Sequence, residues 1–454
     1  MITLRPYQAE AARAILHSVT YHLGLTFTIE MARQSGKNEL SAWLETALLT
    51  RNIVAGGTGI KAAPTFRPQI LNSIDRLRAH LDAAGYAGLH RSSEGFMVWL
   101  GKARWQFFSA GPDAHVVGGT AQLLLELDEA QDVTADKFNK EFRPMASTTN
   151  ATTVLYGTAW DDTTLLEQTK QTNLALQRED GIRRHFEYRW EHCAQANPDY
   201  ARYVEAERER LGANHPLFTT QYDLKPLAGS GRLLTKAQIE QLQGTHAREH
   251  SRAAPGVIYV AGLDVAGEAA AADKLARGHD ETVLTIARVA HQQGRQRPLP
   301  IVSVVSVTRW RGTPHSTLYD EIGDLLQHTW GARIVAVDAT AMGEAAAILL
   351  ARRLGQHRVI PYRFTEHSKS HLGYELQAAA NTNRLALWAA DGSQEYRDTL
   401  RQLALCRAVY KPNRSMQFFV APEDGHDDIV CSLALLVEAA NNATPTVARG
   451  IIRP

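Results

Sequence analysis

Gly36 and Lys37 lie between a run typical of a β-strand and a segment with helical spacing, where a loop can bind the phosphates of a nucleotide. The strand-like run is LTFTIE at 25–30, and the helical segment is ELSAWLETALL at 39–49. The Lys37 ammonium and the N-terminus of the helix both attract phosphate oxygens, and Gly36 lets the backbone approach them closely. Arg33 adds a cation one turn before Lys37. The segment therefore predicts a phosphate-binding loop.

The loop departs from the usual pattern in two places. Met31 stands where the first glycine is usual, and Asn38 follows Lys37 where a serine or threonine normally holds magnesium. Glycine followed by lysine between a strand and a helix is also a common coincidence. The interpretation therefore depends on other segments of the chain.

An acidic pair at the end of a second apolar run supports it. Asp128 and Glu129 follow the apolar residues of AQLLLELDEAQ at 121–131. A carboxylate at the end of a strand can hold magnesium through its waters, and an adjacent glutamate can polarise the water that attacks the γ-phosphate. The alternative is a solvated Asp-Glu pair that only follows a strand.

Two shorter segments fit the same chemistry. LRPYQ at 4–8 places Gln8 before the loop, and its amide carries the donor and acceptor needed to recognise an adenine edge. YGTAW at 156–160 follows another β-rich run, which puts Thr158 at a strand end where it could sense the γ-phosphate. Together and in this order, the four segments predict an ATPase.

Acidic residues in the second half predict a separate metal site. Asp264 closes the first strand of that half, Asp338 closes the fourth, and Asp427 with Asp428 begins the last helix. Carboxylates gathered in one place repel each other, and their oxygens select magnesium or manganese. Two such ions about 4 Å apart can activate a water and stabilise the leaving oxygen of a phosphodiester. The alternatives are a turn residue for Asp264 and a helix cap for Asp427.

Contacts with nucleic acid would have to come from local basic groups, because the formal net charge of the chain is only +1. RAVYKPNRSMQFF at 407–419 predicts a hairpin with Lys411 and Arg414 at its tip, where both could meet phosphates. Lys369 is a second candidate for a DNA contact. The alternative for the hairpin is a solvated turn. Binding through phosphates should weaken steeply with salt.

The order of elements predicts two α/β domains in the chain of 454 residues. In residues 1–190, apolar runs alternate with helical segments, which predicts a mainly parallel sheet of the RecA or P-loop type. Residues 191–255 predict a helical lid or linker, and residues 442–454 predict a tail. In residues 256–441, three strands with short connections precede alternating helices and strands, which is the order of ribonuclease H-like nucleases.

Composition narrows the cellular setting. Hydrophobic residues make up 44% and charged residues 21%, as is usual for globular proteins. No apolar run approaches the roughly 18 residues of a membrane span, and the N-terminus lacks the apolar core of a signal peptide. The three cysteines are scattered, which fits a reducing compartment. We therefore expect a soluble protein without a membrane contact.

These motifs resemble, in kind and order, those of the large subunit of bacteriophage terminases, the motors that package DNA into procapsids. The matching segments are YQ, ARQSGKN, LDEAQ and GTAW within residues 1–165, and the aspartates with HDD within residues 256–440. The resemblance implies a P-loop ATPase domain followed by a ribonuclease H-like nuclease domain. It also implies ATP hydrolysis coupled to translocation of double-stranded DNA, and a metal-dependent endonuclease that cuts concatemeric genomes.

The resemblance implies a role for each matching residue. Glu129 would be the catalytic carboxylate of the ATPase, and Thr158 would couple hydrolysis to movement. The residues that bind ATP and its magnesium ion would be Gln8, Arg33, Gln34, Ser35, Gly36, Lys37, Asn38 and Asp128. The nuclease residues, which would hold two Mg²⁺ or Mn²⁺ ions, would be Asp264, Asp338 and Asp428, with Asp427 as an alternative or additional ligand.

The resemblance also implies partners and a location. They are a portal protein, a small terminase subunit, a homo-oligomeric ring during packaging, and the cytoplasm of the host. A superfamily-two-like helicase or translocase with an accessory nuclease domain is the alternative, because its members also carry Gln8, Lys37 and DEAQ equivalents. Such a helicase needs a second RecA-like domain, which residues 256–440 do not predict. A non-enzymatic ATP-binding scaffold is a third possibility, and the presence of Glu129 with the nuclease aspartates argues against it.

Overall fold

The computed structural model describes residues 2–116, 118–228, 230–253, 256–266, 281–291, 299–341, 343–411 and 413–443. Most of the predicted tail therefore lies outside the described residues. The chain divides into two compact units, Met1–Glu207 with Pro216–Gly229, and Arg208–His215 with Ser230–Pro454. None of the helices in the described ranges is long and apolar enough to cross a membrane.

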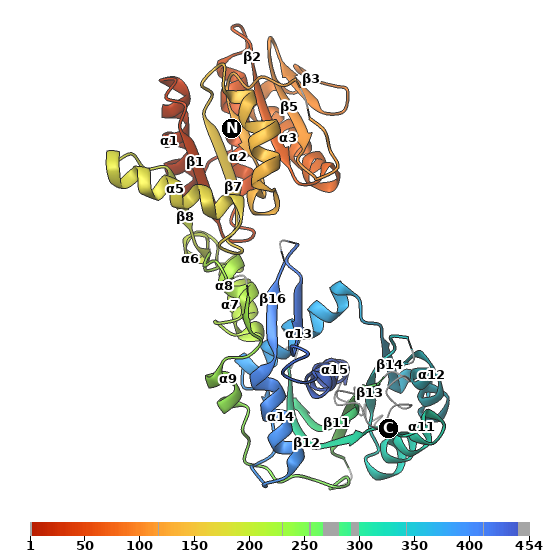
Figure 1. Ribbon diagram of the computed structural model, residues 1–454. Helices are drawn as coiled ribbons and strands as arrows, with labels where there is room; N and C mark the ends of the chain where they lie inside the picture. The colour runs from red at the N-terminus through yellow and green to blue at the C-terminus, as the bar shows by residue number, and fades with distance from the viewer. Residues whose placement is uncertain are drawn as a thin grey trace, which may run out of the picture. The chain divides into compact units, whose positions relative to one another are not determined.

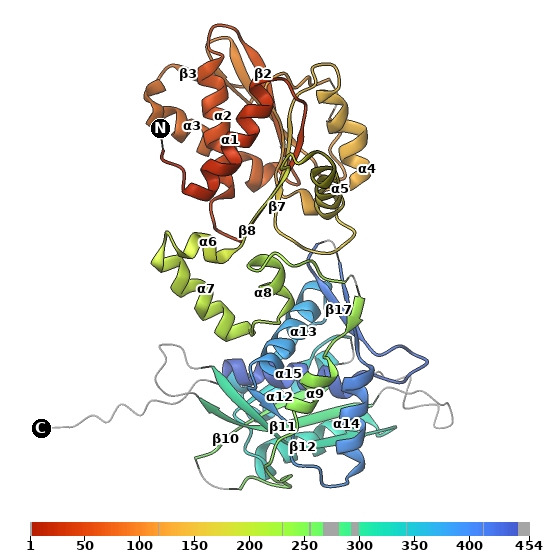
Figure 2. The same cartoon turned by 90° about the vertical axis from the view of Figure 1, so that its left-hand side faces the viewer.

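The first unit is built on an eight-stranded sheet with helices on both faces (Figures 1 and 2). Its strand order is β3-β4-β5-β2-β6-β7-β1-β8, and the neighbours from β5 to β8 are parallel. The elements are α1 Pro6–Thr20, β1 Thr26–Met31, α2 Lys37–Arg51, β2 Gly57–Ala63, α3 Leu71–Leu81, β3 His90–Ser93, β4 Met97–Leu100, β5 Ala103–Ser109, β6 Leu125–Leu127, α4 Ala135–Lys137, β7 Thr153–Gly157, α5 Leu165–Asp180, β8 His185–Tyr188, α6 Trp190–Ala194, α7 Pro198–Leu211 (which continues into the second unit) and α8 Pro216–Gln221.

Both faces of β1 are buried, and apolar residues alternate with buried polar ones along the strand. Phe27, Ile29 and Met31 pack in one core with α1, α2 and α3. The opposite face of the sheet carries a second core, in which Leu125 of β6 packs with Leu166 of α5. Parallel strands covered by helices on both faces are the arrangement that the sequence predicts for this part of the chain. The carboxyl ends of β1, β6 and β7 meet at one edge of the sheet, where ligands bind in such folds.

The second unit contains a six-stranded mixed sheet and a separate three-stranded one. The larger sheet has the order β14-β13-β10-β11-β12-β15, with β10, β11 and β12 antiparallel and β10, β13 and β14 parallel. The smaller sheet has the order β17-β16-β9. The elements are β9 Ser230–Arg232, α9 Lys236–Gln241, β10 Ile258–Asp264, β11 Thr282–His291, β12 Pro300–Trp310, α11 His315–Asp324, β13 Ile334–Asp338, α12 Gly343–Leu354, β14 Val359–Tyr362, α13 Glu366–Asn381, β15 Leu385–Ala386, α14 Gln394–Leu405, β16 Arg407–Tyr410, β17 Met416–Phe419 and α15 Asp428–Asn442.

Alternation along β10 determines which helix covers each face of the larger sheet. Tyr259, Ala261 and Leu263 point toward the core shared with α11 and α12. Gly262 faces α15, and a Cβ at this position would lie only 2.1 Å from the carbonyl oxygen of Ser432. Glycine is therefore required for α15 to approach the sheet closely. Three antiparallel strands followed by alternating helices and parallel strands are the order predicted from the sequence, and this prediction is confirmed.

Candidate functional sites

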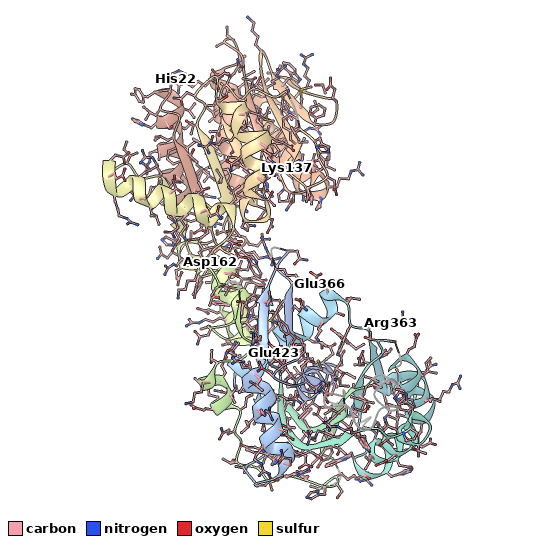
Figure 3. The ribbon with its side chains drawn as sticks, viewed as in Figure 1. His22, Lys137, Asp162, Arg363, Glu366 and Glu423 are labelled. Carbon is pink, nitrogen blue, oxygen red and sulfur yellow. The ribbon has the colours of Figure 1, made fainter. Side chains whose placement is uncertain are left out.

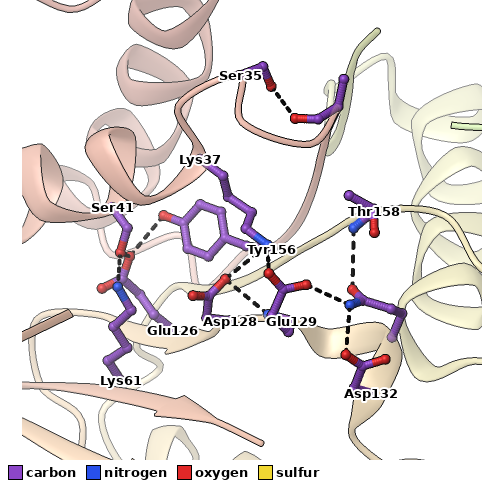
Figure 4. A network of polar contacts seen from close by, with 12 residues as sticks. Ser35, Lys37, Ser41, Lys61, Glu126, Asp128, Glu129, Asp132, Tyr156 and Thr158 are labelled. Carbon is purple, nitrogen blue, oxygen red and sulfur yellow. Dashed lines mark hydrogen bonds and ion pairs between the residues drawn. The ribbon is translucent and has the colours of Figure 1, made fainter. Parts of the chain in front are cut away.

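The predicted phosphate-binding loop is a tight turn between β1 and α2, and Figure 4 shows its residues Ser35 and Lys37. Gln34 and Gly36 both adopt left-handed backbone angles, with φ of 64° and 95°. The hydroxyl of Tyr7 donates to the Ser35 carbonyl at 2.5 Å, and Gln8 Nε2 donates to the Gly36 carbonyl at 2.8 Å. In this structure the Gln8 amide thus shapes the loop itself. A Cβ on Gly36 would lie 2.6 Å from Gln8 Nε2, so this contact also requires the glycine.

Lys37 joins the loop to the predicted acidic pair (Figure 4). Its Nζ lies 2.6 Å from Glu129 Oε1 and 3.2 Å from Asp128 Oδ1. Burial alone would lower the pKa of Lys37, but attraction to Asp128 and Glu129 outweighs it and raises that pKa. The Lys37 ammonium thus offsets one of the two carboxylate charges at the edge of the sheet, close to where phosphates would approach.

Asn38, the residue after Lys37, carries an unpartnered side-chain oxygen. The Asn38 Oδ1 atom is buried and accepts no hydrogen bond within the described part of the chain. An unpaired buried carbonyl oxygen is costly unless a ligand, an ion or a water satisfies it. Together with Asp128, it provides the hard oxygen donors that suit Mg²⁺. The residues present therefore fit a magnesium site, although Asn38 replaces the usual hydroxyl.

Arg33 and Thr158 complete the predicted set, in different environments. Arg33 is exposed on the loop, whereas Thr158 is buried at the end of β7. The Thr158 N–H donates to Gln131 Oε1 at 3.2 Å. Sequence reasoning did not single out Gln131, although it is the last residue of LDEAQ. The contacts thus bring the predicted nucleotide residues of β1, β6 and β7 to one edge of the sheet.

A buried polar network lies behind the loop, and the sequence did not predict it (Figure 4). Lys61 of β2 contacts Glu45 of α2 at 3.1 Å and donates to Ser41 at 2.8 Å. Glu126 of β6 accepts from Ser41 at 2.9 Å and from the hydroxyl of Tyr156 at 2.8 Å. Burial, followed by repulsion from Glu45, raises the pKa of Glu126 well above its ordinary value. The network ties α2 to the strands β2, β6 and β7, which holds the loop helix at a fixed distance from the acidic pair.

In the second unit, strand pairing places two of the predicted aspartates at neighbouring strand ends. Asp264 is the last residue of β10, and Asp338 is the last residue of β13. These strands are parallel, with Leu263 opposite Val337, so that the two aspartates follow side by side.

The third aspartate comes from the last helix. Asp428 is the first residue of α15, and Ser432 one turn later donates to the Gly262 carbonyl at 2.9 Å. This contact beside Asp264 brings the start of α15 to the end of β10. Asp428 Oδ2 also accepts from the backbone N–H of Glu281 at 2.8 Å.

The electrostatics of these carboxyl groups reflect burial and mutual repulsion. Asp264, Asp338 and Asp428 are each less than one tenth exposed. Burial raises the pKa of Asp264 well above its ordinary value, and the neighbouring Asp428, Asp338 and Asp427 raise it further. Burial also raises the pKa of Asp338. A buried group of like charges with this geometry fits divalent cations bound through oxygen.

Lys369 lies at the same site instead of on a separate surface. Its Nζ is 3.4 Å from Asp427 Oδ2 and sits over the rings of Phe418 and Phe364, 4.9 Å and 5.7 Å from their centroids. Burial would lower the pKa of Lys369, but neighbouring acidic groups, among them Cys431 and Asp427, raise it. Lys369 therefore faces the acidic cluster from α13, while Asp427 is the more exposed of the two adjacent aspartates.

The predicted hairpin is formed by β16 and β17, and its tip is tied to α13 (Figure 3). Lys411 Nζ lies 3.1 Å from Glu366 Oε2, while Asn413 and Ser415 donate to Glu366 Oε1 at 2.7 Å and 2.6 Å. Donors on Ser415, Asn413 and Lys411 lower the pKa of Glu366 to about 2. Lys411 is thus paired inside the unit, and Arg414 stands at the tip with a left-handed φ of 64°.

Among the described residues, the acidic and histidine side chains whose ligand atoms all lie within 4.8 Å of one another are not the predicted aspartates but Glu30, His185 and Glu187 of the first unit. The ammonium of Lys170 lies 2.9 Å from Glu30 and 3.9 Å from Glu187. It also contacts Glu167 at 3.3 Å. Because a cation of the chain itself already balances these carboxylates, we interpret the group as an ion-pair cluster.

Comparison with known proteins identifies structural neighbours only. No protein-family model and no curated protein matches the chain. The large terminase from a thermophilic bacteriophage, in one crystal form, matches with a TM-score of 0.54 and 12% identity, over 96% of this chain and 99% of that chain. The same terminase in complex with ADP matches with a TM-score of 0.50 and 11% identity, over 98% and 100%. Its complex with ATP-gamma-S matches with a TM-score of 0.50 and 11% identity, over 96% and 99%.

Similarity at such low identity establishes the fold. The chain has the fold of bacteriophage large terminases, with a mainly parallel sheet in the first unit and a mixed sheet in the second. The resemblance inferred from the motifs is therefore confirmed at the level of the fold.

Proposed function

We propose that the chain is the large subunit of a viral DNA-packaging motor. It hydrolyses ATP to translocate double-stranded DNA into a procapsid, and it cuts concatemeric DNA with a metal-dependent nuclease. The observation that carries this proposal is the combination in one chain of the Lys37–Asp128–Glu129 group with the buried aspartates of the second unit. The proposed domains are an ATPase at 1–190, a linker at 191–255, a nuclease at 256–441 and a tail at 442–454.

In the ATPase, the loop binds the phosphates and the acidic pair serves hydrolysis. Lys37 and Arg33 attract the phosphate oxygens, and backbone N–H groups at the start of α2 do the same. Asn38 and Asp128 would hold Mg²⁺, which neutralises charge on the phosphates when it is bound. Glu129 accepts a hydrogen bond from the attacking water and orients it toward the γ-phosphate.

In the nuclease, the aspartates at the ends of β10 and β13 and at the start of α15 form the metal site. Asp264, Asp338 and Asp428 would hold two Mg²⁺ or Mn²⁺ ions, with Asp427 as an additional or alternative ligand. Such ions activate a water and stabilise the leaving oxygen of a phosphodiester. Lys369 places its ammonium beside Asp427, where it can attract the phosphate of the strand to be cut.

Other contacts with DNA follow from the placement of basic groups. Arg414 at the hairpin tip is proposed to meet backbone phosphates, and Lys411 would join it only by exchanging its contact with Glu366. Portal protein, small terminase subunit, ring assembly and the host cytoplasm are proposed from the resemblance of the motifs. The helicase alternative is less well supported, because the described residues of the second unit form a mixed sheet and not a second RecA-like sheet.

Two assays with the purified chain test the proposal. Supercoiled plasmid is incubated with Mg²⁺, Mn²⁺ or EDTA, and ATP hydrolysis is measured with and without linear double-stranded DNA. We expect cleavage with either metal and none with EDTA, and faster hydrolysis in the presence of DNA. A chain that neither hydrolyses ATP nor cuts DNA would overturn the proposal, and unwinding of a forked duplex would favour the helicase.

A further inference from the structure

Gln131 is buried between the proposed catalytic glutamate and the proposed coupling threonine. Its Nε2 donates to Glu129 Oε2 at 2.6 Å and to Asp132 Oδ2 at 3.2 Å, while its Oε1 accepts from the Thr158 N–H at 3.2 Å. Only one orientation of the amide satisfies a carboxylate at one end and an N–H at the other. Figure 4 shows the three partners of this amide, Glu129, Asp132 and Thr158.

The backbone around Gln131 is shaped for this contact. Gly157, the last residue of β7, has no side chain, and a Cβ there would lie 2.1 Å from Gln131 Oε1. Gln131 itself is 3% exposed, so that water does not readily replace either hydrogen bond. A displacement of the Glu129 carboxylate must therefore move Gln131 or break a short buried bond.

Gln221, the last residue of α8, meets the same threonine from the other side. Its Nε2 donates to Thr158 Oγ1 at 3.5 Å, and its carbonyl accepts from the Arg33 N–H of the loop at 2.8 Å. Gln221 is 4% exposed. One buried residue thus contacts both the phosphate-binding loop and the segment after β7.

The chain that follows α8 remains attached to the coupling segment until it leaves the first unit. The Leu227 N–H donates to the Trp160 carbonyl at 2.8 Å, and Leu227 forms an isolated parallel bridge with Asp161. Residues 216–229 belong to the first unit, and the second unit resumes at Ser230. The residues in contact with Thr158 and Trp160 are therefore the last ones before the chain enters the nuclease unit.

We propose that Gln131 and Gln221 are positioning residues that link the state of Glu129, through Thr158, to the segment 216–228. The proposal rests on the proposed ATPase and names the route by which hydrolysis reaches the connection between the units. The contact between the Arg33 N–H and the Gln221 carbonyl should change when a nucleotide binds, because Arg33 lies on the phosphate-binding loop. The contact between Gln131 and Glu129 should depend on whether a γ-phosphate is present, because Glu129 is the residue proposed to orient the attacking water.

Hydrogen–deuterium exchange of the full chain with ADP or ATP-gamma-S tests this route. In the wild type, we expect amide exchange in 216–228 to differ between the two nucleotides. Gln131→Met keeps the volume of the side chain but loses all three hydrogen bonds of the amide, so that the two nucleotides should give the same exchange there. Gln221→Met should reduce the same difference. The matched control is Gln168→Ala, an exposed glutamine on α5 that should retain the difference.

Steady-state kinetics separates positioning from a structural role. In Gln131→Met, kcat for ATP should fall by about tenfold or more, while KM changes less than about twofold. Gln131→Glu keeps an acceptor for Thr158 but repels Glu129, and its kcat should be lower still. An unchanged kcat in Gln131→Met, or exchange in 216–228 that is equal for ADP and ATP-gamma-S in the wild type, overturns the proposal. Failure of the wild type to bind either nucleotide would instead overturn the ATPase itself.

Discussion

The two acidic centres of the chain differ in the source of their positive charge. At the end of β6, the Lys37 ammonium lies between Asp128 and Glu129, within 3.2 Å of both. At the ends of β10 and β13, Asp264 and Asp338 are buried together with Asp428, and the ammonium of Lys369 forms its ion pair with the more exposed Asp427.

This difference indicates how each centre depends on its ligands. At the proposed ATPase centre, a lysine of the chain offsets one of the two carboxylate charges, so we expect this centre to form before nucleotide binds. At the proposed nuclease centre, the aspartates outnumber the one lysine beside them, so we expect this centre to need external cations for stability as well as activity. We therefore expect changes of charge to have opposite consequences at the two centres.

Removal of Asp264 should have the largest effect and should be confined to DNA cleavage. Bound metals contribute several kcal/mol to transition-state stabilisation, so Asp264→Ala should lower plasmid cleavage by about 1000-fold or more. ATP hydrolysis should stay within about twofold of the wild type, because the other unit carries it. Cleavage is followed on plasmid gels in Mn²⁺, with Asp320→Asn as an exposed acidic control in the same unit. Persistent cleavage by a pure preparation of the variant would contradict the assignment of Asp264 to the nuclease site.

Removal of the Glu129 charge should have the reciprocal effect. Glu129→Gln should bind ATP but hydrolyse it about 100-fold more slowly or worse, because the water loses its general base. Plasmid cleavage with Mn²⁺ should remain intact. Phosphate release and binding of a fluorescent ATP analogue separate the two effects. Loss of cleavage in the same variant would break the separation between the two centres.

The sequence indicated which candidate ligands the fold brings together better than it indicated their surroundings. Gly36-Lys37 and HDD are local patterns, and the strand order follows from periodic apolar runs, so these features are readable along the chain. The contact between Glu366 and Ser415 joins residues 49 positions apart, and no local pattern indicates that Lys411 is already paired there. The buried network of Lys61 and Glu126 was missed for the same reason, since a charge in an apolar run shows its partner only after folding.

Removal of the Lys37 ammonium should destabilise the chain even without nucleotide. Lys37→Met leaves Asp128 and Glu129 without their shared cation, which should cost about 3 kcal/mol of unfolding free energy. Urea unfolding without nucleotide or metal measures this loss. Lys140→Met is the matched control, because Lys140 is exposed and its contact with Asp136 should contribute less than about 1 kcal/mol. Equal losses of unfolding free energy in the two variants would mean that the pair of Asp128 and Glu129 does not need Lys37 for its stability.

Addition of metal should stabilise the nuclease unit, in contrast to the ATPase unit without nucleotide. At a Mn²⁺ concentration of 100 times its Kd, the gain should be about 2.7 kcal/mol, seen as a higher melting temperature. Asp264→Asn should lose this gain and should melt no lower than the wild type in EDTA, because it removes one of several buried like charges. If Mn²⁺ stabilised this variant as much as the wild type, the ions would have to bind at a site that does not include Asp264.

The smallest expected effect concerns Asn38, whose buried Oδ1 has no hydrogen-bond partner among the described residues. If this oxygen contributes to holding magnesium, Asn38→Ala should weaken binding of the Mn²⁺ complex of ATP by about tenfold and leave metal-free ATP binding unchanged. Asn38→Ser returns an oxygen to the position and should recover most of the affinity. Titrations of a fluorescent ATP analogue in Mn²⁺ and in EDTA measure both quantities, with Asn52→Ala at the other end of α2 as the control. Equal affinity in Asn38→Ala and the wild type would leave Asp128 as the metal ligand without help from Asn38. Metal binding at the proposed ATPase centre would then depend on the acidic pair alone. The position of that pair depends in turn on its contacts with Lys37.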